Sequence, residues 1–153
     1  MAPSCADPPP AALLAGIAEF NRGEYFACHE RLEAIWMHEP GPIRRLYQGL
    51  LQIGVGLYHL HNGNYRGTVN LLGSGIAYLE PFAPLCNGVC LDPLLAQARL
   101  IRAAVVALGP AHVREYVLPS LPQITLTDEV RLAVPFSVVP DLPISPAAHP
   151  GHW

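Results

Sequence analysis

The chain has 153 residues, 51% of them hydrophobic, and a formal net charge of -3 at pH 7. This length and apolar content predict one domain with a proper core, and no run reaches the roughly 18 uncharged apolar residues of a membrane span. Without a basic run, the chain also lacks an electrostatic footprint for nucleic acid or anionic lipid. We therefore expect neither nucleic-acid nor membrane partners. Because residues 1–10 lack the pattern of a signal peptide, we expect a cytoplasmic location.

Caps and breakers predict five helices in chain order, after a Pro-rich leader over residues 1–10 that we expect to be flexible. The predicted helices are 11–21, 24–38, 42–61, 64–79 and 92–108, with a short sixth helix over 111–117. Gly23, Pro40 and the Asn62-Gly63 pair separate the first four helices. In the fourth and fifth helices, Asn64 and Asp92 are the expected caps.

The C-terminal segment over 119–153 carries seven prolines, which forbid a long helix. Residues 124–134 show some apolar alternation, so we expect an extended arm. The division of the chain is then a leader over 1–10, a helical domain over 11–118 and a tail over 119–153. The predicted fold is all-α with five to six helices, the first four forming two successive hairpins around a buried central helix.

A weak internal repeat supports the two hairpins. Shifting the chain by 40 residues (63 minus 23) lays Gly23 and Tyr25 on Gly63 and Tyr65. Each unit reads as a helix, a glycine turn, a tyrosine and a second helix. We interpret the repeat as hairpin packing.

Four cysteines are present, and only Cys86 and Cys90 lie close together in the sequence. Their three-residue spacer fits neither a redox motif nor a complete zinc set, so we expect loop thiols that the cytosol keeps reduced. Cys28 lies within a predicted helix, where it should pack as a small hydrophobic residue.

Polar residues occupy helix faces that should be buried. At 100° per residue, His29 and Glu33 share a stripe of helix 24–38 with Tyr25 and Trp36, and Glu30 lies at its flank. In the second repeat unit, Val69 and Gly73 replace His29 and Glu33. Packing alone therefore does not require the polar pair.

The helix over 42–61 is apolar almost all round, which predicts the central position. Its exception is a narrow stripe formed by Arg45, Gln48, Gln52 and His59. Two buried polar stripes on consecutive antiparallel helices most economically face each other, so we expect a shared cluster.

Three interpretations of this cluster stay open. The first is a divalent metal held by His29, Glu33 and His59, a ligand set that suits zinc or iron. The second is a metal-free small-molecule site, in which His29, Glu30 and Glu33 are candidate catalytic residues. The third is a buried hydrogen-bond network that only fixes helix register. In the second case, the ligand contacts would come from Arg45, Gln48, Gln52 and Trp36.

We therefore predict a small-molecule-binding or metal-binding helical protein and leave open whether it is an enzyme, with a hydrolase as the reaction class considered. The alternative is a non-catalytic protein interaction module. A homo-oligomer is compatible with either function.

The ordered motifs of the first half resemble the family called domain of unknown function 309 (DUF309). They are Phe20-Asn21-x-Gly23-x-Tyr25-Phe26-x-x-His29-Glu30-x-Leu32-Glu33-x-x-Trp36, Gln48-Gly49-Leu50-x-Gln52 and Gly63-Asn64-x-x-Gly67. The resemblance covers residues 12–79, with Leu51 and Thr68 in place of the usual Ile and Ala. It implies a small all-helical protein, found mainly in bacteria and archaea, in a family without an established reaction.

Overall fold

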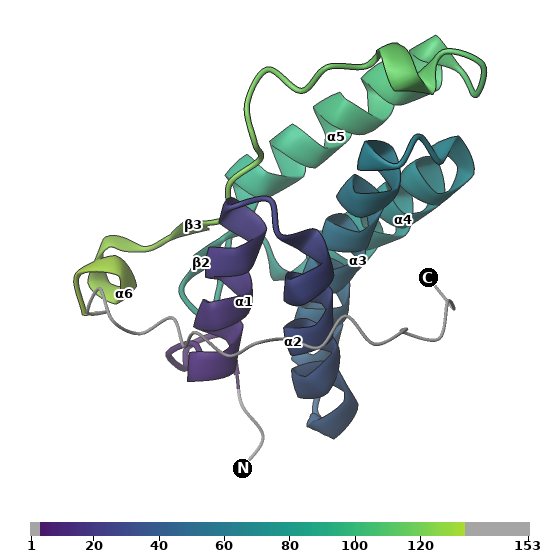
Figure 1. The fold of residues 1–153 in the computed structure, drawn as a ribbon. Helices are drawn as coiled ribbons and strands as arrows, with labels where there is room; N and C mark the ends of the chain where they lie inside the picture. The colour runs from purple at the N-terminus through teal and green to yellow at the C-terminus, as the bar shows by residue number, and fades with distance from the viewer. Residues whose placement is uncertain (1–3, 134–153) are drawn as a thin grey trace.

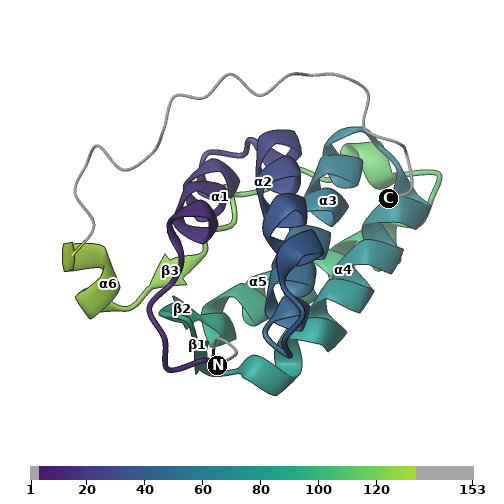
Figure 2. The same ribbon diagram turned by 90° about the horizontal axis from the view of Figure 1, so that it is seen from below.

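A computed structural model describes residues 4–133, which form a set of packed helices with a small sheet at one end (Figure 1). Each long helix packs chiefly against the next one in the chain (Figure 2). The long helices are α1 (Ala11–Asn21), α2 (Tyr25–His38), α3 (Arg44–His61), α4 (Tyr65–Leu79) and α5 (Leu91–Leu108). The all-α prediction and the five predicted helices are confirmed, with boundaries that differ by no more than two residues.

Helix α3 is the central helix, as predicted, and it is buried along nearly its whole length. Its glycines let α4 approach closely: a Cβ on Gly49 would lie 2.7 Å from a methyl carbon of Leu79. A Cβ on Gly75 of α4 would lie 2.8 Å from Ile53. The two helices are therefore packed closer than alanine at these positions would allow.

The two glycine turns of the repeat adopt the same left-handed backbone, with φ of 79° at Gly23 and 72° at Gly63. Glycine is suited to both positions because it has no Cβ to oppose positive φ. The Asn64 side chain accepts a hydrogen bond from the Gly67 amide at 3.0 Å, which confirms the predicted cap. The predicted cap at Asp92 is wrong, because α5 already begins at Leu91 and its N-cap is Cys90.

A three-stranded antiparallel sheet was not predicted. Its strands are β1 (Leu85–Cys86), β2 (Val89–Cys90) and β3 (Thr125–Leu126), in the order β1-β2-β3. Asn87 and Gly88, both at positive φ, form the turn between β1 and β2. An Asn-Gly pair is a strong hairpin signal, but the strands beside it are only two residues long.

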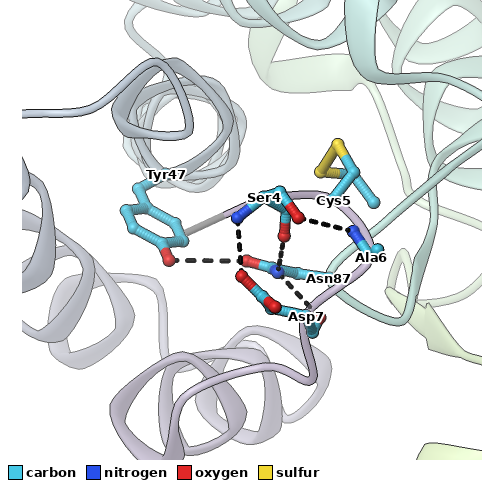
Figure 3. Close-up of a disulfide and its surroundings, with 7 residues drawn as sticks. Ser4, Cys5, Ala6, Asp7, Tyr47 and Asn87 are labelled. Carbon is cyan, nitrogen blue, oxygen red and sulfur yellow. Dashed lines mark hydrogen bonds between the residues drawn. A yellow bond between two sulfur atoms is a disulfide. The ribbon is translucent and has the colours of Figure 1, made fainter. Parts of the chain in front are cut away.

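The expectation of reduced loop thiols is wrong for Cys86, which forms a disulfide with Cys5 (Figure 3). The Asn87 side chain donates hydrogen bonds to the carbonyls of Ser4 (3.0 Å) and Asp7 (2.9 Å). Residues 4–7 of the expected flexible leader are thus held against the hairpin by one covalent and several polar contacts. As predicted, Cys28 is free and buried.

The segment after α5 returns along the ends of the helices to β3 (Figure 1). In place of the predicted helix over 111–117, it contains a single 3-10 turn, η2 (Val113–Glu115). Asn21 holds its far end, accepting from the Ile124 amide at 2.7 Å and donating to the Ile124 carbonyl at 3.0 Å. We call residues 113–121 of this segment the strap.

The expected extended arm is interrupted by a short helix, α6 (Asp128–Ala133). Pro135 and the later prolines lie outside the described residues, as do His149, His152 and Trp153. Among residues 4–133, no helix is both long and apolar enough to cross a membrane.

Candidate functional site

The predicted pair on α2 is present. Nε2 of His29 lies 3.3 Å from Oε2 of Glu33, one helical turn away, and the side chains are 5% and 14% exposed. Helix α2 packs against α3, which carries the buried Gln52. A carboxylate beside a buried imidazole orients the ring, which serves a catalytic site or a structural network equally well.

Two further polar atoms of this region lack hydrogen bonds. Oε1 of Glu30 and Oε1 of Gln52 are buried, and neither has a partner within the described part of the chain. Since an unsatisfied buried polar group costs roughly 1 to 3 kcal/mol, such atoms are rare in native proteins. Both atoms are hydrogen-bond acceptors.

The predicted metal set does not assemble. His59 faces α4: its Nδ1 lies 3.2 Å from Nδ2 of Asn64, and a Cβ on Gly67 would lie 2.6 Å from its ring. Among residues 4–133, no group of three or more His, Cys, Asp or Glu side chains could hold a metal ion. His29 and Glu33 therefore do not converge with His59, because α2 and α4 pack on different faces of α3.

The other candidate ligand contacts are also dispersed. Arg45 stacks over the Tyr78 ring of α4, with its guanidinium carbon 5.4 Å from the ring centre. Arg44 stacks on Trp36 at 4.5 Å and donates to the Trp36 carbonyl at 3.1 Å. Gln48 lies half-buried on α3, one turn before Gln52. Arg45 and Trp36 thus pack against other side chains.

A pocket that the sequence did not predict lies between the two glycine turns and the strap, with a volume of about 830 Å³. Gly23 lines one side and Gly63 another, and the strap contributes Val117 and Leu121. We call it the turn pocket. The repeat was the only sequence signal for it, because the repeat places two similar turns at one end of the helices.

Tyr25 is the most informative residue of the turn pocket. Its side chain lines the pocket, only 7% of the residue is exposed, and its hydroxyl has no hydrogen-bond partner among the described residues. Burial raises the pKa of Tyr25 to about 12. A buried tyrosine hydroxyl usually finds a partner, so a residue of the pocket lining carries a polar group that the described residues leave unsatisfied.

Phe26 connects the turn pocket with the polar pair. Its ring centre lies 6.1 Å from that of His29 and 6.1 Å from that of Tyr58, and both Phe26 and Tyr58 line the pocket. Trp36, by contrast, is ten residues further along α2, about 15 Å at the helical rise. The pocket wall therefore touches His29 but lies far from the Trp36 end of the helix.

A comparison with known families matches the segment that contains most of α1, all of α2 and α3, and the first half of α4. Residues 13–71 match the family described as "Domain of unknown function (DUF309)". We call residues 13–71 the DUF309 segment after this match. The match contains His29, Glu33 and Gln52 as well as both glycine turns.

The chain is also similar to a curated protein. The chain is 36% identical over 73 residues to "Uncharacterized protein YpuF" of Bacillus subtilis (strain 168). The alignment covers 46% of the chain and 42% of that protein, so the chain spans less than half the length of the curated relative it matches. No solved structure matches the chain. The strap, at 113–121, lies outside the DUF309 segment, which thus supplies only part of the turn pocket.

Proposed function

We propose that the protein binds a small, largely apolar molecule in the turn pocket. The observation that carries this proposal is Tyr25, which lines the pocket and whose buried hydroxyl has no hydrogen-bond partner among the described residues. The pocket volume of about 830 Å³ falls within the range typical of small-molecule sites. A ligand that hydrogen-bonds to Tyr25 would satisfy a group that the protein itself leaves unsatisfied.

The lining supports an apolar ligand over a strongly polar one. Aromatic rings of Phe26 and Tyr58 meet aliphatic side chains of Leu57, Leu60 and Leu121 there. Such a surface gains free energy when it is covered, at roughly 25 cal/mol per Å² of apolar area. The concave shape favours a small molecule over the flat contact of a protein interaction module.

The test uses N-phenyl-1-naphthylamine, an uncharged fluorescent probe of apolar pockets. Ala27 lines the turn pocket, so Ala27→Phe should fill part of it and weaken probe binding by about tenfold or more. Ala34 is exposed on the same helix two turns later and does not line the pocket, so Ala34→Phe is the matched control. Equal binding by all three proteins, or no binding, would overturn the proposal.

A second candidate function is hydrolysis of the bound molecule, favoured by the position of the His29–Glu33 pair behind Phe26. An imidazole oriented by a carboxylate can act as a general base toward water. His29→Gln should then abolish any hydrolysis of a chromogenic ester such as p-nitrophenyl butyrate. The exposed His38 on the same helix provides the control His38→Gln, which should leave the rate unchanged.

The cytoplasmic location stays a proposal. The Cys5–Cys86 disulfide counts against it, because disulfides persist mainly in oxidising compartments. Alkylation of free thiols in freshly lysed cells, followed by mass spectrometry, would show whether the bond exists there. A reduced pair would support the cytoplasm.

A further inference from the structure

The charged groups of the turn pocket are mostly cationic. The arginines Arg22 and Arg114 line it, and Glu24 is the one carboxylate in its described lining. Arg22 binds both oxygens of Glu24, at 2.8 Å and 3.2 Å. This contact lowers the pKa of Glu24 and keeps it ionised and engaged. Of the arginines that line the pocket, Arg114 is therefore the one whose charge no carboxylate of the described lining offsets.

Arg114 differs from the arginines that are paired elsewhere. Arg31, Arg99 and Arg131 each form an ion pair with a carboxylate. Within residues 4–133, Arg114 instead donates only to the Asn62 carbonyl, at 3.2 Å. A guanidinium has five N–H donors, so most of them are free for another acceptor.

The position of Arg114 depends on the second glycine turn. A Cβ on Gly63 would lie 2.5 Å from the central guanidinium carbon of Arg114. The absence of a side chain at Gly63 thus lets the guanidinium lie flat on the turn, next to the pocket. Together with the contact to Asn62, this holds the cation at the wall and limits the entropy lost when it binds an anion.

We propose that the ligand of the turn pocket is a small carboxylate with an aromatic or branched apolar body. The carboxylate pairs with Arg114, the body covers Phe26 and Tyr58, and the Tyr25 hydroxyl receives or supplies the remaining hydrogen bond. The assignment rests on the proposed function, since it names the ligand class for the same pocket. Arginine suits a carboxylate because its planar fork makes two parallel hydrogen bonds.

The experiment displaces bound N-phenyl-1-naphthylamine with two competitors of nearly equal shape, 4-phenylbutyrate and its uncharged amide, 4-phenylbutanamide. The parent protein should release the probe at about tenfold lower concentrations of the acid than of the amide. Arg114→Gln should bring the two competitors to within about twofold of each other, as judged by the ratio of their half-displacement concentrations. Arg66→Gln, at an exposed position of α4 outside the pocket, should keep the tenfold preference.

The outcomes separate the two proposals. If the probe binds but the parent shows no preference for the acid, the ligand class is wrong and the apolar pocket stands. A preference that survives in Arg114→Gln would remove Arg114 from the site and overturn the inference. If the probe does not bind and the acid produces no shift in melting temperature, both proposals fail. Thermal denaturation of Arg114→Gln checks that the surface substitution leaves the fold intact.

Discussion

At the scale of single residues, the buried polar atoms divide into two kinds. Some are paired: Glu19 and Arg31 join α1 to α2 through a 2.6 Å contact, with side chains 4% and 15% exposed. Others, such as the Tyr25 hydroxyl and Oε1 of Gln52, have no partner in the described chain. Paired groups fix the packing of helices, whereas unpaired ones mark positions where a ligand or water would be stabilising.

Helical spacing alone predicted His29 and Glu33, because the two residues are neighbours on one helix. It did not predict the pairing of Glu19 with Arg31, which join two helices. Glu19 lies in a mostly apolar helix and would be taken for a solvated residue by itself. Ion pairs between helices depend on the angle and register of packing, which no local pattern contains.

Tyr25 gives a pH prediction. Its pKa is raised from 10.0 to about 12 by burial, so between these values the unfolded chain loses the phenolic proton and the folded chain keeps it. The contribution of Tyr25 to the free energy of unfolding is complete below pH 10.0. It declines as the pH rises toward 12, at no more than about 1.4 kcal/mol per pH unit. Urea denaturation across this range should show the decline, and Tyr25→Phe should reduce it. An unchanged slope in the variant would contradict the burial of this hydroxyl.

At the scale of elements, glycines set the distance between α3 and α4. A Cβ on Gly75 would lie 3.1 Å from the carbonyl oxygen of Gly49, an atom of the backbone that cannot move aside alone. A Cβ on Gly73 would instead meet the flexible end of Arg102, also at 3.1 Å. Gly73 and Gly75, two of the three glycines of α4, are thus a natural comparison.

Gly75→Ala should lower the free energy of unfolding by about 1 to 3 kcal/mol, because overpacking forces the helices apart. Gly73→Ala is the control and should be neutral or stabilising by up to about 1 kcal/mol, since alanine favours the helix and Arg102 can shift. Urea denaturation of both variants measures the difference. If Gly75→Ala were as stable as Gly73→Ala, the close α3–α4 contact would be wrong.

At the scale of the whole molecule, two long-range contacts tie residues near both ends of the described chain to its interior. Cys5 is bonded to Cys86, 81 residues away, and Asn21 holds Ile124 through two hydrogen bonds. The strap lies between these anchors and the end of α5, where it closes the turn pocket. The proposed ligand site therefore includes parts of the chain outside the DUF309 segment.

Removing the disulfide should destabilise the fold. For a closed loop of this length, Cys5→Ser should lower the free energy of unfolding by about 2 to 4 kcal/mol, because the unfolded chain regains freedom. Cys90→Ser, at a free cysteine, is the matched control. Adding dithiothreitol should bring the parent down to the stability of Cys5→Ser. A parent unaffected by dithiothreitol would argue against the bond.

The sequence by itself determined the helices and their order. Gly23, Gly63, Asn64 and the prolines act on the backbone within one turn, so their effects can be read without knowing the fold. The apolar character of α3 likewise predicted its central place. The His29–Glu33 pair follows from the same local arithmetic.

Only the tertiary structure decided which segments meet. It placed His59 and Arg45 against α4, joined Cys5 to Cys86, and brought the strap over the two glycine turns. The turn pocket, its unpartnered Tyr25 hydroxyl and the unpaired Arg114 all arise from that meeting. The physical reason is that contacts between different helices and loops depend on how whole helices pack, and helical periodicity describes one helix at a time.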